Sequence, residues 1–361
     1  MRPDLRYLVG LSLLPGIGPA RFARLIELRG DAERAWRASP DDLARVGVEP
    51  SKIPALLERR RTLDLSAEME RIRRLDVTVL AADDPAYPLR LREIYNAPPL
   101  LYVLGELTPA DGQAIGVVGS RGPTLYGRER TAHVVPELVQ AGLTIVSGLA
   151  RGIDTIAHQA ALEAGGRTVA VLGSGIDVLY PAENRALARR IVGQGAVITE
   201  YPLGTQPDAY NFPARNRLIS GLSLGVLVVE AKLSSGALIT ADYALEQNRE
   251  VFAFPGRAGD KMSAGCNRLI REGRAKLVTE TAHILDELDL TAAVRQLEIK
   301  AALPANDEES RLLALLSHEP MHIDDLARGA SLPAPTVAGT LLMLELKGTI
   351  RQVGAMSFVL A

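Results

Sequence analysis

The chain has 361 residues, of which 47% are apolar and 23% are charged, and its formal net charge is −2. This length exceeds what one hydrophobic core usually supports, so we expect more than one domain, and the composition excludes an extended disordered chain. The single cysteine, Cys266, excludes an internal disulfide framework and a cysteine-based zinc site within one chain. No apolar run has the length of a membrane span, so we expect a cytoplasmic protein without signal peptide or membrane anchor.

Residues 1–76 have the short apolar periodicity of a small helical domain. Within it, "LLPGIGPARFARLIE" (13–27) places a glycine turn before a basic helix, which resembles a helix-hairpin-helix or SAM-like element. The backbone N–H groups of such a turn can bind a nucleic-acid phosphate, although similar turns also serve as plain connectors. The segment has 15 Lys and Arg against 12 Asp and Glu, a mildly basic balance.

Residues 77–111 predict two short strands around a proline-rich loop, as an extension to the domain that follows. From 112 to 290, apolar runs of strand length alternate with amphipathic stretches of helix length. Strands that are apolar on both faces, each followed by a helix, predict a parallel sheet covered on both sides. We therefore expect a Rossmann-like, doubly wound α/β domain. The runs are "AIGVVG", "LTIVSG", "RTVAVLG", "AVITEY", "GVLVVEA", "EVFAFPG" and "KLVTE".

Residues 291–304 are interpreted as a linker, and 305–361 as a winged-helix domain with three helices and a closing hairpin. A winged helix usually inserts its third helix into a DNA groove. Here the domain has 4 Lys and Arg against 7 Asp and Glu, and "APTVAGTLLMLELKG" contains a single cation, Lys347. The charge disfavours duplex recognition and favours a protein-binding or vestigial role.

Ligands of open α/β sheets bind beyond the carboxyl ends of the strands, and several of these ends are rich in glycine. The first, "GSRGPT", has Arg121 where a dinucleotide fingerprint keeps a small residue. Glycine turns and free helix N-termini suit phosphate groups, and several of them along one edge suit a polyanion. The candidate residues in these turns are Gly119, Ser120, Arg121, Thr124, Ser147, Gly148, Ser235 and Gly236.

A second segment, "NFPARNRLISGLS" (211–223), groups Arg215, Asn216 and Arg217 at the start of a predicted helix, just after Phe212. Arginine can donate two hydrogen bonds to one phosphate, and an aromatic ring can stack on an unpaired base. The alternative is an ion-pair cluster on the protein surface. Two further cations are weaker candidates for DNA contact, Lys261 after "FPG" and Arg185 after "YPAEN".

Together these segments resemble the DNA-processing protein A family, DprA or Smf. The matching blocks are "GSRGPTLYG", "SGLARGID", "AVLGSGIDVLYPAEN", "TEYPLGTQPDAYNFPARNRLISGLS", "VVEAKLSSGALITADYALEQNREVFAFPG" and "SAGCNRLI". They cover nearly all of 112–290. Thr124 stands where the family commonly has serine, so a hydroxyl is retained.

The resemblance implies a single-stranded DNA-binding protein without catalytic activity or cofactor. It also implies a homodimer that helps to load RecA onto incoming strands in natural transformation. On this interpretation, the loop 119–124 holds backbone phosphate, and Arg215, Asn216 and Arg217 grip the same strand.

An enzyme is the alternative hypothesis. Glu200 and Glu230 end predicted strands at the same edge and could act as an acid and base pair. The rival enzyme is a nucleotide-processing Rossmann enzyme like the phosphoribohydrolases of the LOG type, whose related fold has a "PGGxGT" loop and a nearby catalytic glutamate. The segment "SSGALITADYALE" echoes the "PGGxGT" loop of those enzymes only loosely, since it lacks the double glycine and has Asp242 where a glutamate is expected. The histidines have no spacing that indicates a metal site.

Overall fold

The computed structural model describes residues 2–290, 307–317, 319–346, 350–354 and 356–360. Contacts divide the chain into two units, Met1–Leu288 and Asp289–Ala361, and each is described by itself. The predicted linker, 291–304, lies outside the described residues.

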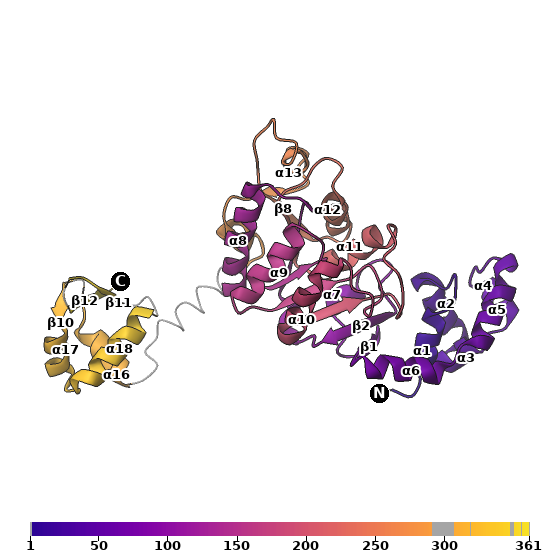
Figure 1. Ribbon diagram of the computed structural model, residues 1–361, viewed down its shortest axis with the longest axis horizontal. Helices are drawn as coiled ribbons and strands as arrows, with labels where there is room; N and C mark the ends of the chain where they lie inside the picture. The colour runs from indigo at the N-terminus through magenta and orange to yellow at the C-terminus, as the bar shows by residue number, and fades with distance from the viewer. Residues whose placement is uncertain (1, 291–306, 318, 347–349, 355, 361) are drawn as a thin grey trace. The chain divides into compact units, whose positions relative to one another are not determined.

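A nine-stranded sheet forms the centre of the first unit (Figure 1). Its strand order is β1-β2-β6-β5-β4-β3-β7-β8-β9; β1 pairs with β2 and β2 with β6 in antiparallel register, and all other pairs are parallel. The strands are β1 (Thr78–Ala81), β2 (Leu100–Gly105), β3 (Ala114–Val118), β4 (Thr144–Ser147), β5 (Thr168–Val171), β6 (Ala196–Thr199), β7 (Gly225–Val228), β8 (Glu250–Ala253) and β9 (Lys276–Leu277).

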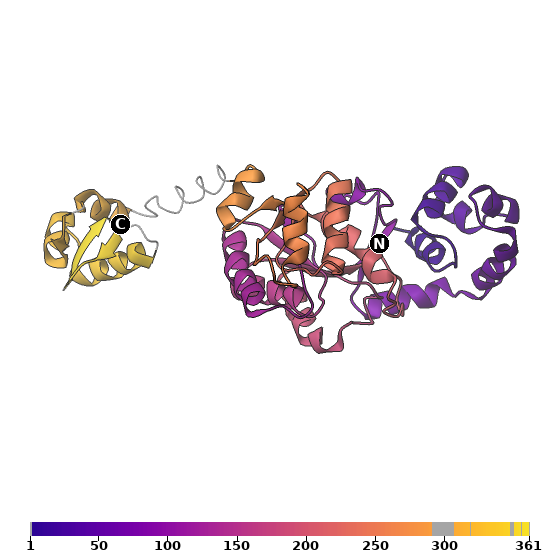
Figure 2. The same cartoon turned by 90° about the horizontal axis from the view of Figure 1, so that it is seen from above.

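The predicted doubly wound fold is confirmed. The chain runs from β3 through β4 and β5 to β6, and then crosses back to β7 beside β3. Helices α9 and α11 both pack on β3, β4 and β5, and Figure 2 shows the helices that follow β3–β5 and those that follow β6 and β7 on opposite sides of the sheet. The covering helices are α8 (Leu125–Gln140), α9 (Ile153–Glu163), α10 (Arg185–Gln194), α11 (Asn211–Leu222), α12 (Gly236–Glu246), α13 (Ala264–Arg271) and α14 (Thr281–Glu287).

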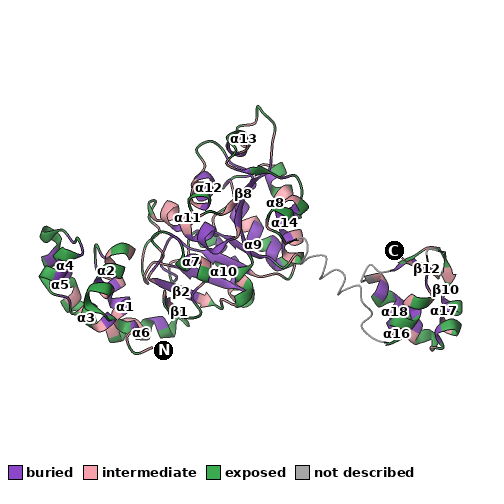
Figure 3. Cartoon of the chain, turned by 180° about the vertical axis from the view of Figure 1, so that it is seen from behind, coloured by how far each residue is buried: buried purple, intermediate pink, exposed green. Residues whose placement is uncertain are grey.

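Burial explains why these segments are strands. Every residue of β3, β4, β5, β6 and β7 is buried, as strands covered on both faces require (Figure 3). The last predicted strand, "KLVTE", contributes only two residues, and both of them are exposed.

The helical module packs directly on the sheet. It comprises α1 (Leu5–Ser12), α2 (Pro19–Arg29), α3 (Ala32–Trp36), α4 (Pro40–Arg45), α5 (Ile53–Thr62) and α6 (Leu65–Arg74). One hydrophobic cluster includes Leu11 of α1, Tyr102 of β2 and Val197 of β6. The hydroxyls of Ser12 and Tyr102 lie 3.3 Å apart. The sequence did not predict α7 (Leu89–Arg92), a short helix in the loop between β1 and β2.

The second unit has the predicted winged-helix order. Its elements are α16 (Asp307–Leu315), β10 (Met321–His322), α17 (Ile323–Ala330), α18 (Ala334–Leu346), β11 (Ile350–Gln352) and β12 (Ser357–Leu360). Leu312, Leu326 and Leu341 form its core, one from each helix, and none is accessible to solvent. The cation noted in the sequence, Lys347, lies outside the described residues.

Because the helical module and the sheet share one core, we expect them to unfold together. Leu11→Ala removes a side chain with 0% exposure and should lower the free energy of unfolding by about 2–5 kcal/mol. When the full chain is unfolded in denaturant, the helical module and the sheet should unfold in one transition, and the variant should shift the midpoint of that transition for both. A separate early transition for the helices, with the sheet unchanged, would contradict this coupling.

Candidate nucleic-acid interface

A large concavity in the described residues lies where the strand order reverses. β3 neighbours β4 on one side and β7 on the other, which makes its carboxyl end a topological switch point. A cleft of about 730 Å³, the switch-point cleft, opens there between the loops after β3 and β7 and the first turns of α11 and α12. Eight of the predicted site residues line it: Gly119, Ser120, Arg121, Phe212, Arg215, Asn216, Ser235 and Gly236.

Close packing explains the glycine at the start of the β3 loop. A Cβ at Gly119 would lie 2.6 Å from Ile153 Cγ1 and 3.0 Å from the carbonyl oxygen of Glu230. The Ser120 N–H donates to that same carbonyl at 2.8 Å. The loop after β3 is therefore held against the ends of β7 and the start of α9, with its outer side toward the cleft.

The carboxylate of Glu230 fixes the other end of this loop. It is 1% exposed and accepts hydrogen bonds from Thr124 N (2.9 Å) and Thr124 Oγ1 (2.5 Å). Thr124 also caps α8, since its Oγ1 accepts from Gly127 N. Thr124 does not line the cleft, and its hydroxyl, expected to contact phosphate, instead holds the loop to β7.

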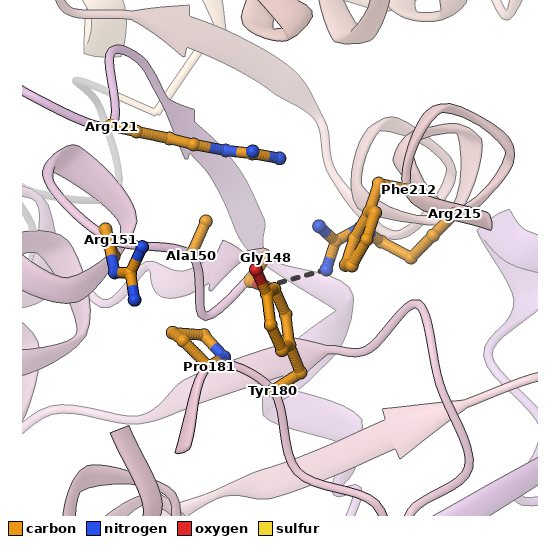
Figure 4. Close-up of a pocket in the computed structure, with 8 residues that line it drawn as sticks. All are labelled: Arg121, Gly148, Ala150, Arg151, Tyr180, Pro181, Phe212 and Arg215. Carbon is orange, nitrogen blue, oxygen red and sulfur yellow. Dashed lines mark hydrogen bonds between the residues drawn. The ribbon is translucent and has the colours of Figure 1, made fainter. Parts of the chain in front are cut away.

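Arg121 presents an exposed guanidinium at the cleft. It lies 5.8 Å from the ring centroid of Phe212, and Figure 4 shows it extended across the opening toward that ring. The ring of Tyr180 lies 5.5 Å from Phe212 at an interplanar angle of 45°. Among the described residues no carboxylate pairs with Arg121, so its charge is available beside two aromatic surfaces.

Arg215 has a different environment from the one that the sequence suggested. It is 4% exposed, and its Nη1 donates to the carbonyl of Gly148 at 2.7 Å (Figure 4). The same Nη1 also donates to the carbonyl of Val171. These carbonyls follow β4 and end β5, so the guanidinium joins two neighbouring strands at the edge of the cleft. Burial lowers the pKa of Arg215 to about 10, and the nearby carboxylate of Asp154 opposes that shift.

The surroundings of Arg215 are buried and polar. Asp154 accepts from Gly148 N (3.1 Å) and Ala150 N (3.3 Å), and desolvation raises its pKa although the charge of Arg215 lowers it. A Cβ at Gly148 would lie 2.6 Å from Arg215 Nη2 and 2.7 Å from Asp154 Oδ2, so any larger residue would displace this buried pair. His158, also buried, donates or accepts at Thr168 Oγ1, and desolvation lowers its pKa to about 3.

Helix α11 separates the arginines that the sequence grouped together. Asn216 donates to the carbonyl of Gly236 (3.2 Å) at the cleft. Arg217 pairs with Glu200 and lines a different cavity, because residues two positions apart project to nearly opposite sides of a helix. The structure therefore does not bring Arg215, Asn216 and Arg217 onto one ligand surface.

The other predicted residues have varied positions. Gly148 lines a small pocket that adjoins Arg121 and Phe212. Ser235 caps α12, with its Oγ accepting from Ala237 N. Ser147 is buried and donates to the carbonyl of Val117. Arg185 begins α10 and Lys261 lies in the exposed loop after β8, and neither lines the cleft.

The sequence analysis did not identify several residues that line this site. Tyr180 and Lys232 line the switch-point cleft, and Arg151, which pairs with Glu183, lines the adjoining pocket. Lys232 stands in "VVEAK", directly beyond a strand end, and that position could have identified it. Tyr180 reaches the cleft from a loop between β5 and α10, and only the fold places it beside Phe212.

In the part of the chain that the structure describes, no group of three or more His, Cys, Asp or Glu could hold a metal ion. No helix in that part is both long enough and apolar enough to span a bilayer.

The fold and the cleft define a class: a doubly wound α/β protein with a ligand cleft at the topological switch point, joined in one chain to a winged helix. Residues 78–289 match the family described as DNA recombination-mediator protein A, and residues 299–356 match the DprA winged helix domain. The chain therefore belongs to the DprA/Smf family.

Known relatives are similar in sequence to most of this chain. Protein Smf of Synechocystis is 36% identical over 98% of both chains, and Protein Smf of Escherichia coli is 43% identical over 76% of this chain and 75% of its own length. The solved structure of DNA processing protein A from Streptococcus pneumoniae matches with a TM-score of 0.67 and 38% identity, covering 80% of this chain and 98% of the other.

A second solved structure is that of DNA processing protein A from Helicobacter pylori, described for its single-stranded DNA binding mode. It matches with a TM-score of 0.54 and 28% identity, and covers 59% of this chain and 96% of the other.

The burial of Arg215 predicts a structural role for its side chain. Arg215→Ala leaves the carbonyls of Gly148 and Val171 without this donor and removes the cation beside the buried carboxylate of Asp154. We expect a loss of about 3–5 kcal/mol in the free energy of unfolding, measured in denaturant. Arg121→Ala is the matched control, and it should change stability by less than about 0.5 kcal/mol.

Equal, small effects of the two variants would contradict this assignment. If Arg215→Ala does not fold, Arg215→Lys supplies the measurement, because it keeps the charge near Asp154 but cannot donate in the same geometry.

Proposed function

We propose that this chain binds single-stranded DNA in the switch-point cleft. The observation that carries the proposal is Arg121, an exposed cation 5.8 Å from the ring of Phe212 and without a carboxylate partner among the described residues. A free guanidinium can bind a backbone phosphate while the aromatic rings stack on unpaired bases. Base stacking of this kind needs bases that are not already paired.

The lining of the cleft suits a DNA strand better than it suits a single mononucleotide. The N-terminal turn of α12 faces the cleft through Ser235 and Gly236, and a Cβ at Gly236 would meet nothing within 4 Å. The exposed Lys232 adds a second cation on the same wall. Helix N-termini and free cations suit successive phosphates. The Helicobacter pylori relative, described for its single-stranded DNA binding mode, supports the same ligand.

Family membership supports further proposals. We propose that the protein works in the cytoplasm as a homodimer and hands the bound strand to RecA in natural transformation. The acidic winged helix, with 4 Lys and Arg against 7 Asp and Glu, suits a protein partner better than a DNA duplex.

The positions of the carboxylates favour a binding protein over an enzyme. The acid and base pair of the phosphoribohydrolase hypothesis would need Glu200 and Glu230 free at one site. Glu230 is bound to Thr124, and Glu200 pairs with Arg217 on the far side of α11. Asp242, at the position of the expected glutamate, pairs with Arg274.

Strand preference tests the proposal. Fluorescence anisotropy with an oligo-dT strand and with a blunt duplex of the same length should show tighter binding of the single strand, because stacking on Phe212 and Tyr180 requires unpaired bases. Release of adenine or AMP from nucleotides is assayed in parallel. Equal or tighter duplex binding would overturn the proposed ligand, and turnover would restore the enzyme hypothesis.

A salt titration tests the role of Arg121. Each phosphate neutralised on a single strand contributes about −0.7 to the slope of log affinity against log salt, so Arg121→Ala should reduce the magnitude of the slope by about 0.7. The loss should be the same for oligo-dT and for mixed sequences, because a phosphate contact carries no base information.

Arg189→Ala is the matched control for this titration. Arg189 is an exposed arginine of α10 that does not line the cleft, and its loss should leave the slope unchanged. Equal changes of slope for the two variants would indicate a diffuse electrostatic effect and count against a phosphate contact at Arg121.

A further inference from the structure

A second cavity, of about 410 Å³, lies between the helical module and the α/β body of the first unit. Its lining comes from the glycine turn and first helical residues of α2, from the loop after α7 and from α11. The residues are Gly18, Pro19, Ala20, Arg21, Arg24, Asn96 and Arg217. None of them lines the switch-point cleft. We refer to this concavity as the hairpin cavity.

The two walls of the hairpin cavity are held in place by the shared core. Phe22 and Leu25 of α2 belong to the same hydrophobic cluster as Tyr102 of β2. The position of the α2 turn relative to α11 is therefore set by buried contacts between the module and the sheet.

Positive charge dominates this cavity. Three arginines line it, and none of its lining residues is acidic. Arg217 pairs with Glu200 and is 12% exposed, while its Nη1 has no hydrogen-bond partner among the described residues. Arg24 is exposed, and no described carboxylate pairs with it. The cavity therefore has more cationic charge than its own structure neutralises.

The start of α2 adds hydrogen-bond donors to this charge. Gly18 is the N-cap in extended backbone, no side chain caps the helix, and Pro19 occupies its first turn. The first N–H groups of a helix have no partner within it, so those of Ala20 and Arg21, both in the cavity lining, are oriented for an anion. Arg21 also donates to the Gly16 carbonyl at 2.8 Å, which closes the glycine turn.

Helix α11 connects the two concavities. Arg215 and Asn216 line the switch-point cleft, and Arg217 lines the hairpin cavity. Two aromatic residues next in sequence to these linings are exposed: Tyr210 directly precedes α11, Tyr95 directly precedes Asn96, and each is 87% exposed. A strand that leaves the cleft over the first turn of α11 would meet cations and an aromatic ring again on the other side.

We propose that the hairpin cavity is a second phosphodiester site for the same single DNA strand that occupies the switch-point cleft. This inference rests on the proposed function, because it extends the path of that strand. The helical module thus lengthens the binding site, and Arg24 and the α2 turn bind backbone phosphate there.

Strand length separates the two sites experimentally. Affinities of the full chain are measured for oligo-dT of about 6 and about 20 nucleotides, within and beyond the usual size of one single-strand site. Arg24→Ala should bind the short strand like the wild type and the long strand about three- to fivefold more weakly, the effect of one exposed ion pair. Its salt slope should fall by about 0.7 for the long strand only.

The control variant is Arg45→Ala, an exposed arginine of the same module outside the cavity, which should bind both lengths like the wild type. Long strands that contain 5-iodouracil should crosslink to Tyr95 in the wild type and less in Arg24→Ala. The inference is overturned if Arg24→Ala loses affinity for both lengths alike, has no effect, or matches Arg45→Ala. If the wild type binds neither strand, the proposed function itself fails.

Discussion

The cleft depends on the hydrogen bonds that the guanidinium of Arg215 donates to the main chain. The guanidinium donates to main-chain carbonyls at the ends of two adjacent strands, and it balances the buried carboxylate of Asp154 on the following helix. Strand ends in a parallel sheet carry main-chain groups that no neighbouring strand satisfies, and a buried one without a partner is costly. A single forked side chain satisfies two of them at once and fixes the floor of the cleft.

Glu230 performs the equivalent task on the other wall, where it binds the loop between β3 and α8 through the main chain and hydroxyl of Thr124. Two buried ionic groups of opposite sign thus hold the loops, and the exposed Arg121 is free of structural partners. Three arginines within a hundred positions of the chain therefore have three different roles. Arg121 faces the ligand, Arg215 supports the main chain, and Arg217 pairs with Glu200.

Much of this architecture could be predicted from the sequence, because strands buried on both faces have a continuous apolar pattern and their order along the chain restricts the topology. The glycine loops were placed correctly at the sheet edge for the same reason. Side-chain direction could not be predicted, since it depends on the exact start of α11: a shift of one residue would rotate Arg215 and Arg217 by about 100°. Long-range partners such as Glu230 for Thr124, 106 positions apart, have no local signature.

The antiparallel pairing of β2 with β6 has a consequence for the integrity of the sheet. β6 is apolar and fully buried, and β2 occupies the row of main-chain donors and acceptors along its outer side. A chain shortened to begin at β3 would leave that row open, and an uncovered apolar edge is a template for pairing with other chains. The N-terminal extension thus protects the sheet against self-association, and because it precedes the parallel strands in the chain, it is already synthesised when β6 emerges.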